Sequence, residues 1–521
     1  QRCYQCQHSR LSKLFSMKKI IDKFKKFNPC KPLAILYILL IITISFFTLR
    51  IIDNDFWFLI NQGRYIIENG FPTVEPFTIH NNLSFIIQQW LTDVIFYGIY
   101  HSFGHIGIII LIFIVNVLIV YLLYKICILI SENKVFLSVI LTAIIDFILL
   151  IFFIRTRPQI FDYTILLTEI YILENYLKTR NQKYLLVLPI LSLLLINLHS
   201  SSWFMLFLFI LPYLVTSFDF KIFFLKGENY PKKYLFLIII PMFLAGFINP
   251  YGIKAITYIF TSFGDKYINS IVNEMHPMYK IGIPNAIACL LPIIITIVVN
   301  IIKRKEIKAR YFFLQLGTMI LGLSSAKGYS FFLIGGVFPL AYYLKDYFKT
   351  YEANYHYSKP FKIKYIIIVL MIIVLPLSIS LSMSSSTFES LGVKKIVSFL
   401  DKNENKENII LYTDYDTGSY LEWKKYKVYI DPRAEVFIKR NNKRKDIFKE
   451  YYYLQYKVFD IDKFVANYNF THFIVNDNDR LYSYLVNNSK KYQLLYVEKS
   501  NKEDKHHKKI KYYLFKRVDV A

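Results

Sequence analysis

Long apolar runs separated by short basic connections constrain the fold of this chain more than any other feature. Most runs approach the roughly 20 residues that an α-helix needs to cross the hydrocarbon core of a bilayer. Hydrophobic residues make up 55% of the 521 residues, a share that a water-soluble protein of this length rarely reaches. The pattern predicts a polytopic α-helical membrane protein with about 11 transmembrane helices, followed by a soluble C-terminal α/β domain.

The expected spans alternate with connections of two kinds. The spans cover residues 33–52, 105–124, 135–154, 162–178, 184–198, 203–217, 234–248, 285–302, 311–324, 329–345 and 364–382. If the N-terminus is cytoplasmic, so are the connections that contain lysine or arginine, at 125–134, 178–184, 218–233, 303–310 and 346–363. This agrees with the positive-inside rule. The sequence therefore predicts a multi-pass protein of the cell membrane with a cytoplasmic N-terminus and an extracytoplasmic C-terminal domain.

The same threading divides the chain into three parts. Residues 1–32 form a basic cytoplasmic segment, in which Met17 resembles a natural start, so residues 1–16 are expected to be an upstream extension. Residues 33–382 form the transmembrane domain, and residues 383–521 form the outer domain. In the outer domain, helix-like stretches alternate with strand-like runs, which predicts a compact α/β fold. The expected helix is 388–402, and the expected strands are 408–412, 427–430, 472–476, 492–498 and 509–516.

Two long loops are expected on the outer face, at 53–104 and 249–284. Within the first, residues 85–100 are apolar but shorter than a comfortable span, so we expect a helix that lies along the membrane interface. The alternative is a twelfth span, which would invert every later loop. The agreement between charge and topology favours the interfacial helix.

The net charge of +26 at first suggests nucleic acid as a partner. However, much of the basic charge flanks apolar runs, where it orients the helices and contacts anionic headgroups. No nucleic-acid-binding module accompanies it. The expected partners are therefore membrane lipids and not nucleic acid.

Two carboxylates stand where the first expected span ends, Asp53 and Asp55. An amphipathic run that carries Arg64 follows them directly, which indicates an ordered element. A carboxylate at this depth could deprotonate an acceptor hydroxyl or share a divalent metal such as Mg²⁺ or Mn²⁺. The alternative is a solvated loop start. The sequence leaves metal dependence open.

Cations also occur on the expected outer face. Arg155 and Arg157 lie at the outer end of a span, against the positive-inside bias, and Lys327 lies at another outer corner. Guanidinium groups suit phosphate oxygens, so these residues are candidates for binding a donor phosphate. The alternative for the arginines is snorkelling to lipid headgroups. Further candidates near the same face are Arg64, Glu75, His199, Glu274 and His276, although His199 could equally cap a helix.

The order of several short motifs resembles the GT-C superfamily of membrane glycosyltransferases, and is most similar to bacterial members related to the protein mannosyltransferases. In the membrane part these motifs are Asp53-Asn54-Asp55-Phe56-Trp57, Gly63-Arg64, Pro72, Glu75-Pro76-Phe77-Thr78, Trp90-Leu91, Arg157-Pro158-Gln159, Asn197-Leu198-His199 and Asn249-Pro250-Tyr251-Gly252. In the tail they are Gly418-Ser419-Tyr420-Leu421-Glu422-Trp423 and Ile430-Asp431-Pro432-Arg433-Ala434-Glu435. The resemblance covers most of the chain from about residue 33.

This resemblance implies a sugar transfer from a polyprenyl-phosphate or polyprenyl-diphosphate donor on the extracytoplasmic face. It places the catalytic acidic residue in the first outer loop, at Asp53 or Asp55. Glu75 stands where related chains often have Asp, and Lys327 stands where they often have Arg. These departures leave the individual ligand roles open. The acceptor, whether glycan, lipid or protein, is also left open.

Two other classes of function compete with a transferase. A transporter or flippase for lipid-linked glycans would need polar residues midway along its helices, whereas most ionisable residues here lie at the ends of spans. A non-catalytic membrane protein could use its tail to bind a cell-surface polymer, in which case Asp431-Pro432-Arg433 would be structural.

Overall fold

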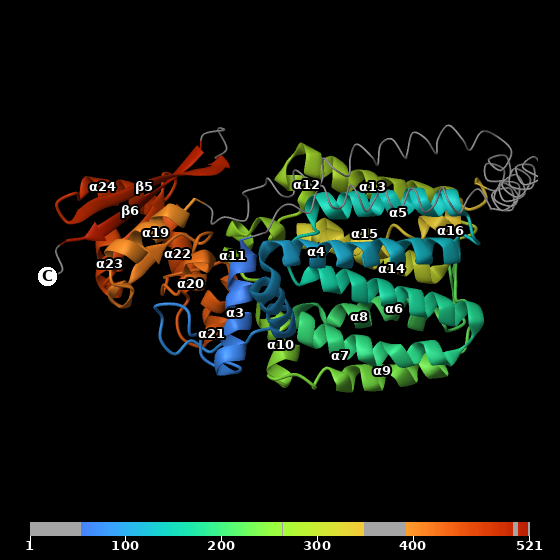
Figure 1. Cartoon of the computed structure of the whole chain (residues 1–521). Coiled ribbons are helices and arrows are strands. Elements are labelled where there is room, and N and C mark those ends of the chain that lie inside the picture. The colour runs from blue at the N-terminus through green and yellow to red at the C-terminus, as the bar shows by residue number, and fades with distance from the viewer. Residues whose placement is uncertain (1–53, 263, 349–391, 504–508, 519–521) are drawn as a thin grey trace, which may run out of the picture.

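A bundle of long helices and a smaller sheet-containing tail make up the molecule (Figure 1). The computed structural model describes residues 54–262, 264–348, 392–503 and 509–518. Two of the expected spans, 33–52 and 364–382, lie outside these residues, as do Asp53 and the N-terminal segment. The expectation of a helical membrane part followed by a mixed α/β region is confirmed.

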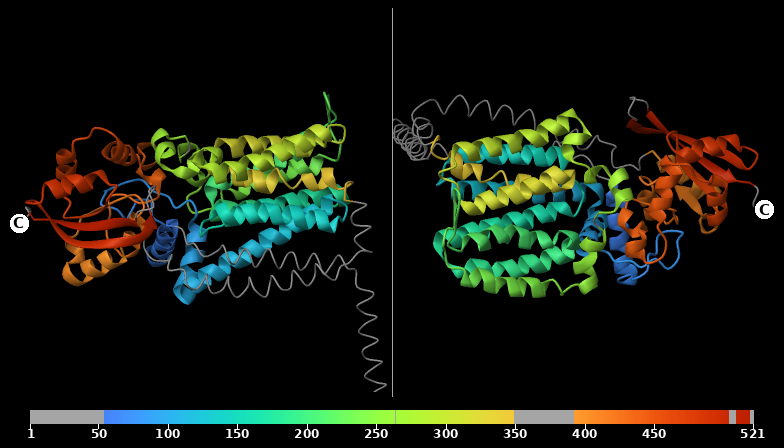
Figure 2. Two further views of the ribbon diagram at one scale, coloured as in Figure 1. Left: turned by 90° about the horizontal axis from the view of Figure 1, so that it is seen from above. Right: turned by 180° about the vertical axis from the view of Figure 1, so that it is seen from behind.

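Every expected span within the described residues coincides with a helix or with two short consecutive helices. These are α4 (Trp90–Ile130), α5 (Val135–Phe152), α6 (Gln159–Thr179), η1 (Gln182–Val187) with α7 (Leu188–Leu198), α8 (Phe204–Thr216), α9 (Lys233–Ala245), α13 (Ile283–Ile302), α14 (Ala309–Ser324), and α15 (Ala326–Gly335) with α16 (Leu340–Leu344). They lie side by side along one direction (Figures 1 and 2). Three of them, α4, α5 and α13, are long and apolar enough to cross a membrane. The total number of spans stays a prediction.

The segment expected as an interfacial helix at 85–100 differs from the prediction. Helix begins at Trp90, residues 88–89 form a turn, and residues 85–87 are not helical: the Phe85 amide donates to the Thr73 carbonyl over 2.9 Å. The helical part then continues into the span of α4 across a kink at Gly104, whose φ of +61° is readily adopted only by glycine. The kink separates the first part of α4 from the rest of the helix, and whether this part lies along the membrane interface stays a prediction.

The outer loops are built from short helices that cover one end of the bundle. The first loop contains α3 (Asp55–Asn69). The second contains α10 (Ile253–Ser262), α11 (Lys266–Ile271), η3 (Asn273–Met275) and α12 (Met278–Ile281), and η2 (Ser200–Ser202) joins α7 to α8. These segments lie between the bundle and the tail (Figure 1).

The opposite end of the bundle carries the basic connections. The short hairpin β1 (Lys221–Ile222) and β2 (Leu225–Lys226) belongs to this end. Here buried Arg310 binds Glu174 through Nε at 3.1 Å and Nη2 at 3.2 Å, and also pairs with Glu228. The two ends of the bundle thus differ in charge as the sequence predicts, and the compartment that each end faces stays a prediction.

The tail is a four-stranded sheet with helices packed on it. Its strands, in the order β3-β4-β6-β5, are β3 (Leu411–Thr413), β4 (His472–Asn476), β6 (Lys509–Arg517) and β5 (Tyr492–Glu503). The pair β3–β4 is parallel and the other pairs are antiparallel. The helices are α19 (Lys394–Asn403), η5 (Lys406–Asn408), α20 (Gly418–Trp423), η6 (Ala434–Phe437), α21 (Lys439–Asn442), α22 (Ile447–Tyr456), α23 (Ile461–Tyr468) and α24 (Arg480–Asn487).

One expected strand, at 427–430, is wrong. Val428 forms only isolated bridges, one to Leu411 of β3 and one to Thr78 in the first outer loop. The backbone that would have extended a strand is used instead to join the loop to the tail: the Ile79 amide donates to the Val428 carbonyl over 3.0 Å. Residues 427–430 therefore bridge the first loop and β3 and do not form a strand of the sheet.

Close packing joins α3 to the tail. Trp57 contacts Tyr420 edge to face with ring centroids 5.0 Å apart, and the guanidinium of Arg64 lies 4.3 Å from the centre of the Trp423 ring. Aromatic and cation–π contacts of this kind add specific geometry to apolar burial. The helix that begins at Asp55 is therefore fixed from both sides, by α4 and by α20.

Candidate functional site

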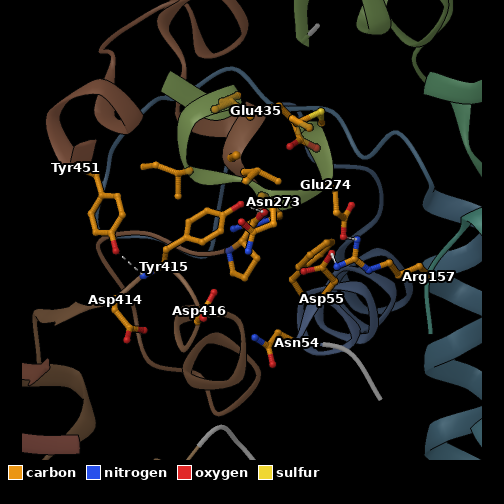
Figure 3. Close-up of a pocket in the computed structure, with 18 of the residues that line it drawn as sticks. Asn54, Asp55, Arg157, Asn273, Glu274, Asp414, Tyr415, Asp416, Glu435 and Tyr451 are labelled. Atoms are coloured by element: carbon orange, nitrogen blue, oxygen red, sulfur yellow. Dashed lines mark hydrogen bonds and ion pairs between the residues drawn. The ribbon is translucent and has the colours of Figure 1, made fainter. Parts of the chain in front are cut away.

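A cavity of about 530 Å³ lies where the helical bundle meets the tail. Its wall is assembled from both parts of the chain. The lining segments include 54–55, 58–59, 88–89, 157–159, 271–275, 414–416 and 432–435, with His199, Lys327 and Asp479. Figure 3 shows Asp55, Arg157 and Glu274 gathered on one side and Asp414, Tyr415 and Asp416 on another. Pockets with a few convergent polar groups are the usual places for ligands.

Asp55, Arg157 and Glu274 meet at the bundle side of this cavity. Nη2 of Arg157 lies 3.1 Å from Oδ2 of Asp55, and its Nη1 pairs with Oε1 of Glu274. Asp55 occupies the first turn of α3, where a carboxylate is favoured by the helix dipole. One guanidinium thus contacts two carboxylates that come from the two outer loops. Arg157 and Glu274 are 117 residues apart in the sequence.

Lys327 supplies a second positive charge to the same wall. It lies in the first turn of α15, whose start is capped by the Ser325 side chain accepting from the Gly328 amide at 3.0 Å. The Ala326 amide also donates to the His276 carbonyl over 2.8 Å, which ties α15 to the second outer loop. Lys327 lines both the main cavity and a smaller adjoining cavity of about 260 Å³.

Arg155 has a different role from Arg157. Its guanidinium donates to the carbonyls of Leu150, Ile151 and Ile154, at 3.1, 2.6 and 2.8 Å. These carbonyls lie at the C-terminal end of α5, where backbone acceptors lack partners within the helix. Of the main cavity and the smaller adjoining one, Arg155 lines the smaller, where it acts as a helix cap beside the main cavity.

His199 is held by a buried network. Its Nδ1 lies 2.7 Å from Oδ2 of Asp162, and the Ser202 hydroxyl donates to the same carboxylate oxygen at 2.7 Å. The Ser201 hydroxyl lies 2.9 Å from Nε2. The imidazole therefore lines the cavity in a fixed orientation, although it also ends α7 as expected for a cap.

The tail contributes an acidic wall. Asp414 is buried and accepts from the Thr417 amide at 2.9 Å and from Asn476 Nδ2 at 2.7 Å, while burial raises the pKa of its carboxyl. Asp479 is also buried, and burial raises its pKa to about 6. Desolvation disfavours the charged form of each carboxyl group. This wall therefore differs in chemistry from the side that carries Arg157 and Lys327.

Arg433 connects the tail to the first loop at the base of the cavity. Its guanidinium contacts three buried carboxylates, with Nη2 3.0 Å from Glu75, 3.1 Å from Glu422 and 2.5 Å from Asp431. Glu75 also accepts from the Thr78 amide and hydroxyl, at 2.9 and 2.6 Å. Glu75 is therefore a buried partner of Arg433 and does not line the cavity.

Arg64 and His276 do not line the cavity. Arg64 contacts Trp423 at the interface between α3 and α20, where burial lowers the pKa of its guanidinium. His276 contacts α15 through its backbone carbonyl, which accepts from the Ala326 amide. Asp53 lies outside the described residues.

A divalent metal is compatible with part of this site. Asp55 and Glu274 lie together on Arg157, and Mg²⁺ is commonly bound through one or two carboxylates together with substrate phosphates. Within the part of the chain that the structure describes, no group of three or more His, Cys, Asp or Glu side chains is arranged to hold a metal ion. A metal at this site would therefore have only these two carboxylates as protein ligands among the described residues, and would need further oxygens from a phosphate.

Several cavity residues were not identified from the sequence. They are Gln88, Gln89, Asp414, Asp416, Asp479 and Glu435, together with Arg433 as an organising residue; Asp162, which binds His199 and does not itself line the cavity, was not identified either. One usable signal existed for Asp162, which follows the Arg157-Pro158-Gln159 motif by one helical turn. The tail carboxylates carry no comparable local signal, because only folding brings them to the bundle.

Solved structures of an archaeal oligosaccharyltransferase, AglB from Archaeoglobus fulgidus, are similar to this chain. The apo form has a TM-score of 0.57 and 12% identity over 95% of this chain and 75% of that chain. The fold is AglB-like. The complex of AglB with an inhibitory peptide and a dolichol-phosphate gives 0.54 and 11% over 95% and 74%. AglB tethered with an acceptor peptide containing the NVT sequon gives 0.55 and 13% over 85% and 69%.

No protein-family model and no curated protein sequence matches the chain. The likeness to AglB, a GT-C membrane glycosyltransferase, is therefore one of fold. This likeness in fold supports the resemblance to GT-C glycosyltransferases that the sequence motifs predict, at the level of fold alone.

Proposed function

We propose that this chain is a membrane glycosyltransferase that moves a sugar from a polyprenyl-phosphate donor to an acceptor on the extracytoplasmic face. The observation that carries the proposal is the meeting of Asp55, Arg157 and Glu274, with Lys327 on the same cavity wall, at the junction of bundle and tail. A carboxylate beside cations, at the end of a bundle with the AglB-like fold, suits chemistry on a lipid-linked phosphate.

In this proposal Asp55 accepts the proton of an acceptor hydroxyl. The hydroxyl oxygen forms a bond to the anomeric carbon while the bond from that carbon to the donor phosphate breaks. The polyprenyl phosphate leaves with the electron pair, and Arg157 and Lys327 stabilise its negative charge. Arg157 also orients Asp55 through their 3.1 Å contact. Asp53, two residues earlier, is the alternative base.

In the alternative in which Asp53 is the base, Asp55 and Glu274 would hold a divalent metal such as Mg²⁺ or Mn²⁺, which would neutralise the donor phosphate. The tail would bind the acceptor, because its wall of Asp414, Tyr415 and Asp416 faces the carboxylate–arginine group across the cavity (Figure 3).

The test is transfer from radiolabelled undecaprenyl-phospho-sugars by the purified full chain. Asp55→Asn keeps the side-chain size and removes the base, so transfer should fall by about 10²- to 10⁴-fold. Asp53→Asn and the double variant decide which carboxylate acts. Glu306→Gln is the matched control, since Glu306 is exposed and pairs with Lys303 at the other end of the bundle. Unchanged transfer in both single variants and the double variant would refute the proposal.

A further inference from the structure

A separate, basic cavity lies where α10 of the second outer loop meets α21 of the tail. Its volume is about 160 Å³. Among the described residues that line it, Lys254, Arg440 and Lys443 are cationic, whereas only Glu435 carries a carboxylate. All three cations are exposed to solvent. A hollow lined mainly by one sign of charge concentrates ligands of the opposite sign, so this basic cavity suits an anion.

Hydrogen bonds between α10 and α21 build the wall of the basic cavity. Nε of Arg440 donates to the Thr261 carbonyl, and Nδ2 of Asn441 donates to the Ser262 hydroxyl over 3.0 Å. Lys443 ends α21 in a left-handed backbone conformation, and its Nζ donates to the Arg440 carbonyl over 2.6 Å. An ammonium group has three donor hydrogens, so this bond leaves Lys443 able to donate to a ligand.

Glu435 separates the basic cavity from the main one. It lines both, whereas Asp55, Arg157 and Lys327 line the main cavity and not the basic one. Its Oε1 accepts from Nε2 of Gln88 over 3.2 Å. A ligand in the basic cavity would therefore leave the proposed donor site open.

The exposed side of α10 carries apolar as well as basic side chains. Ile253 and Phe260 are seven residues apart, so they share one face of the helix, and they are 56% and 65% exposed. Lys254, Thr257 and Thr261, which line the basic cavity, follow the neighbouring strip of the same helix. Adjacent apolar and basic strips are typical of a helix that lies in a membrane interface.

The two strips together distinguish between kinds of anion. A free phosphate or a soluble acidic polymer would meet the three cations and leave Ile253 and Phe260 in water. An anionic phospholipid has a phosphate for the cations and acyl chains for the apolar strip. The position of α10 at the end of the helical bundle, beside α21, agrees with this second kind of ligand (Figure 1).

We infer that the basic cavity binds the phosphate of an anionic phospholipid whose acyl chains lie against Ile253 and Phe260. Lys254, Arg440 and Lys443 contact the phosphate through charge-assisted hydrogen bonds. The bound lipid joins the second outer loop to the tail at the membrane surface. This inference goes beyond the proposed sugar transfer and does not depend on it.

Crosslinking of lipid to the purified full chain in a neutral detergent tests the inference. The probe is phosphatidylglycerol with a diazirine in one acyl chain, and peptide mapping locates the crosslinks. We expect crosslinks on α10, with a yield about tenfold lower for the matching probe of phosphatidylcholine, whose headgroup has no net charge. An excess of glycerol phosphate, which lacks acyl chains, should not displace the phosphatidylglycerol probe.

Substitutions separate the roles of charge and of apolar contact. Lys254→Gln and Lys443→Gln should each weaken the binding of phosphatidylglycerol at α10 about fivefold, because each removes one cation near the headgroup. Phe260→Gln should also weaken it, through the lost contact with an acyl chain. The matched control is Lys395→Gln with Lys402→Gln, at two exposed lysines of α19, and should bind like the unmodified chain. An unchanged midpoint of thermal unfolding shows that each variant is folded.

Three results would overturn the inference. An absence of crosslinks on α10 would mean that no lipid binds there. Equal losses in the control and in the Lys254 and Lys443 variants would assign the effect to overall surface charge. Displacement of the probe by glycerol phosphate, with no effect of Phe260→Gln, would assign the basic cavity to a soluble anion. None of these results depends on sugar transfer, so the proposed function is tested separately.

Discussion

Arg155 and Arg157 are two residues apart, yet their guanidinium groups have different partners. Arg155 caps the end of α5 through three carbonyls, whereas Arg157 holds Asp55 and Glu274 at the cavity. A guanidinium presents its donors as a planar fork, so Arg157 can contact both carboxylates at once. In the proposed function, the charge of Arg157 rather than that of Arg155 acts on the donor, because Arg157 lines the main cavity.

Substitution of Arg157 should separate donor binding from contact with headgroups. Arg157→Ala should lower transfer about 100-fold, since it removes one stabilising cation and leaves Asp55 and Glu274 without their shared partner. Arg157→Lys should recover only part of the activity, because a single ammonium does not reproduce the fork. Arg155→Ala should instead lower the thermal stability more than the transfer rate. Equal rates for Arg, Lys and Ala at position 157 would assign this residue to lipid contact.

Asp479 makes the stability of the tail depend on pH. Its pKa is raised by burial to about 6, above the ordinary value of about 3.9. The folded state therefore binds the proton more tightly than the unfolded state. The contribution to stability is complete below about pH 4 and is lost as the pH rises through about 6.

The variant Asp479→Asn tests this dependence. Its amide oxygen can still accept from the Leu481 amide, as the carboxylate does at 2.9 Å. Between pH 5 and pH 7, the midpoint of thermal unfolding of the unmodified chain should fall relative to that of the variant. Parallel pH profiles for the two proteins would show that Asp479 has an ordinary pKa.

At the scale of elements, the position of Asp55 depends on how α3 crosses α4. Gly63 provides the close approach: a Cβ atom added there would lie 2.1 Å from the carbonyl oxygen of Asp93 and 2.8 Å from the Cβ of Tyr97. Such contacts are well below van der Waals distance, and overpacking at a helix contact costs typically 1–3 kcal/mol. Helix α3 would have to move, and Asp55 would move with it.

Gly63→Ala should therefore reduce transfer and lower the midpoint of thermal unfolding. Gly98→Ala is the matched control in the first part of α4, since a Cβ atom there meets no atom within 4 Å. Alanine favours a helix over glycine by about 1 kcal/mol, so the control should be neutral or slightly stabilising. If both variants behave alike, the spacing of α3 and α4 does not position Asp55.

At the scale of the whole molecule, the cavity exists only because the tail covers the same end of the bundle as the outer loops (Figure 2). The basic connections lie at the other end, around Arg310 and the β1–β2 hairpin. This separation supports the predicted topology, in which the tail and cavity are extracytoplasmic.

Fusions to alkaline phosphatase test this topology, because the enzyme is active only outside the cytoplasm. A fusion after residue 383 should be active, and a fusion near residue 306 should be inactive. The second position lies in the basic connection between α13 and α14, and serves as the cytoplasmic comparison for the first. The reverse pattern would place the cavity on the cytoplasmic face.

The positions of the long helices of the bundle, α19, β4 and most of β6 follow from the sequence, because hydropathy and strand periodicity act over neighbouring residues. The charge difference between the two ends of the bundle follows for the same reason. Part of the site was also predictable: Asp55, Arg157 and Lys327 stand at the ends of apolar runs, Glu274 stands in the second long loop, and the structure brings all four to one cavity.

Only the tertiary structure decided which of the polar residues meet. Arg433 binds Glu75 across 358 positions of sequence. Glu75, a candidate ligand by its sequence, therefore lies in the buried interface between the first loop and the tail. Val428 bridges to the first loop instead of extending a strand. Gln88 lines the cavity, and its side-chain amide donates to Glu435 of the tail. Local pattern can place a polar residue at the end of a helix. Its partner depends on packing between distant segments, because hydrogen bonds and ion pairs act only over a few ångströms.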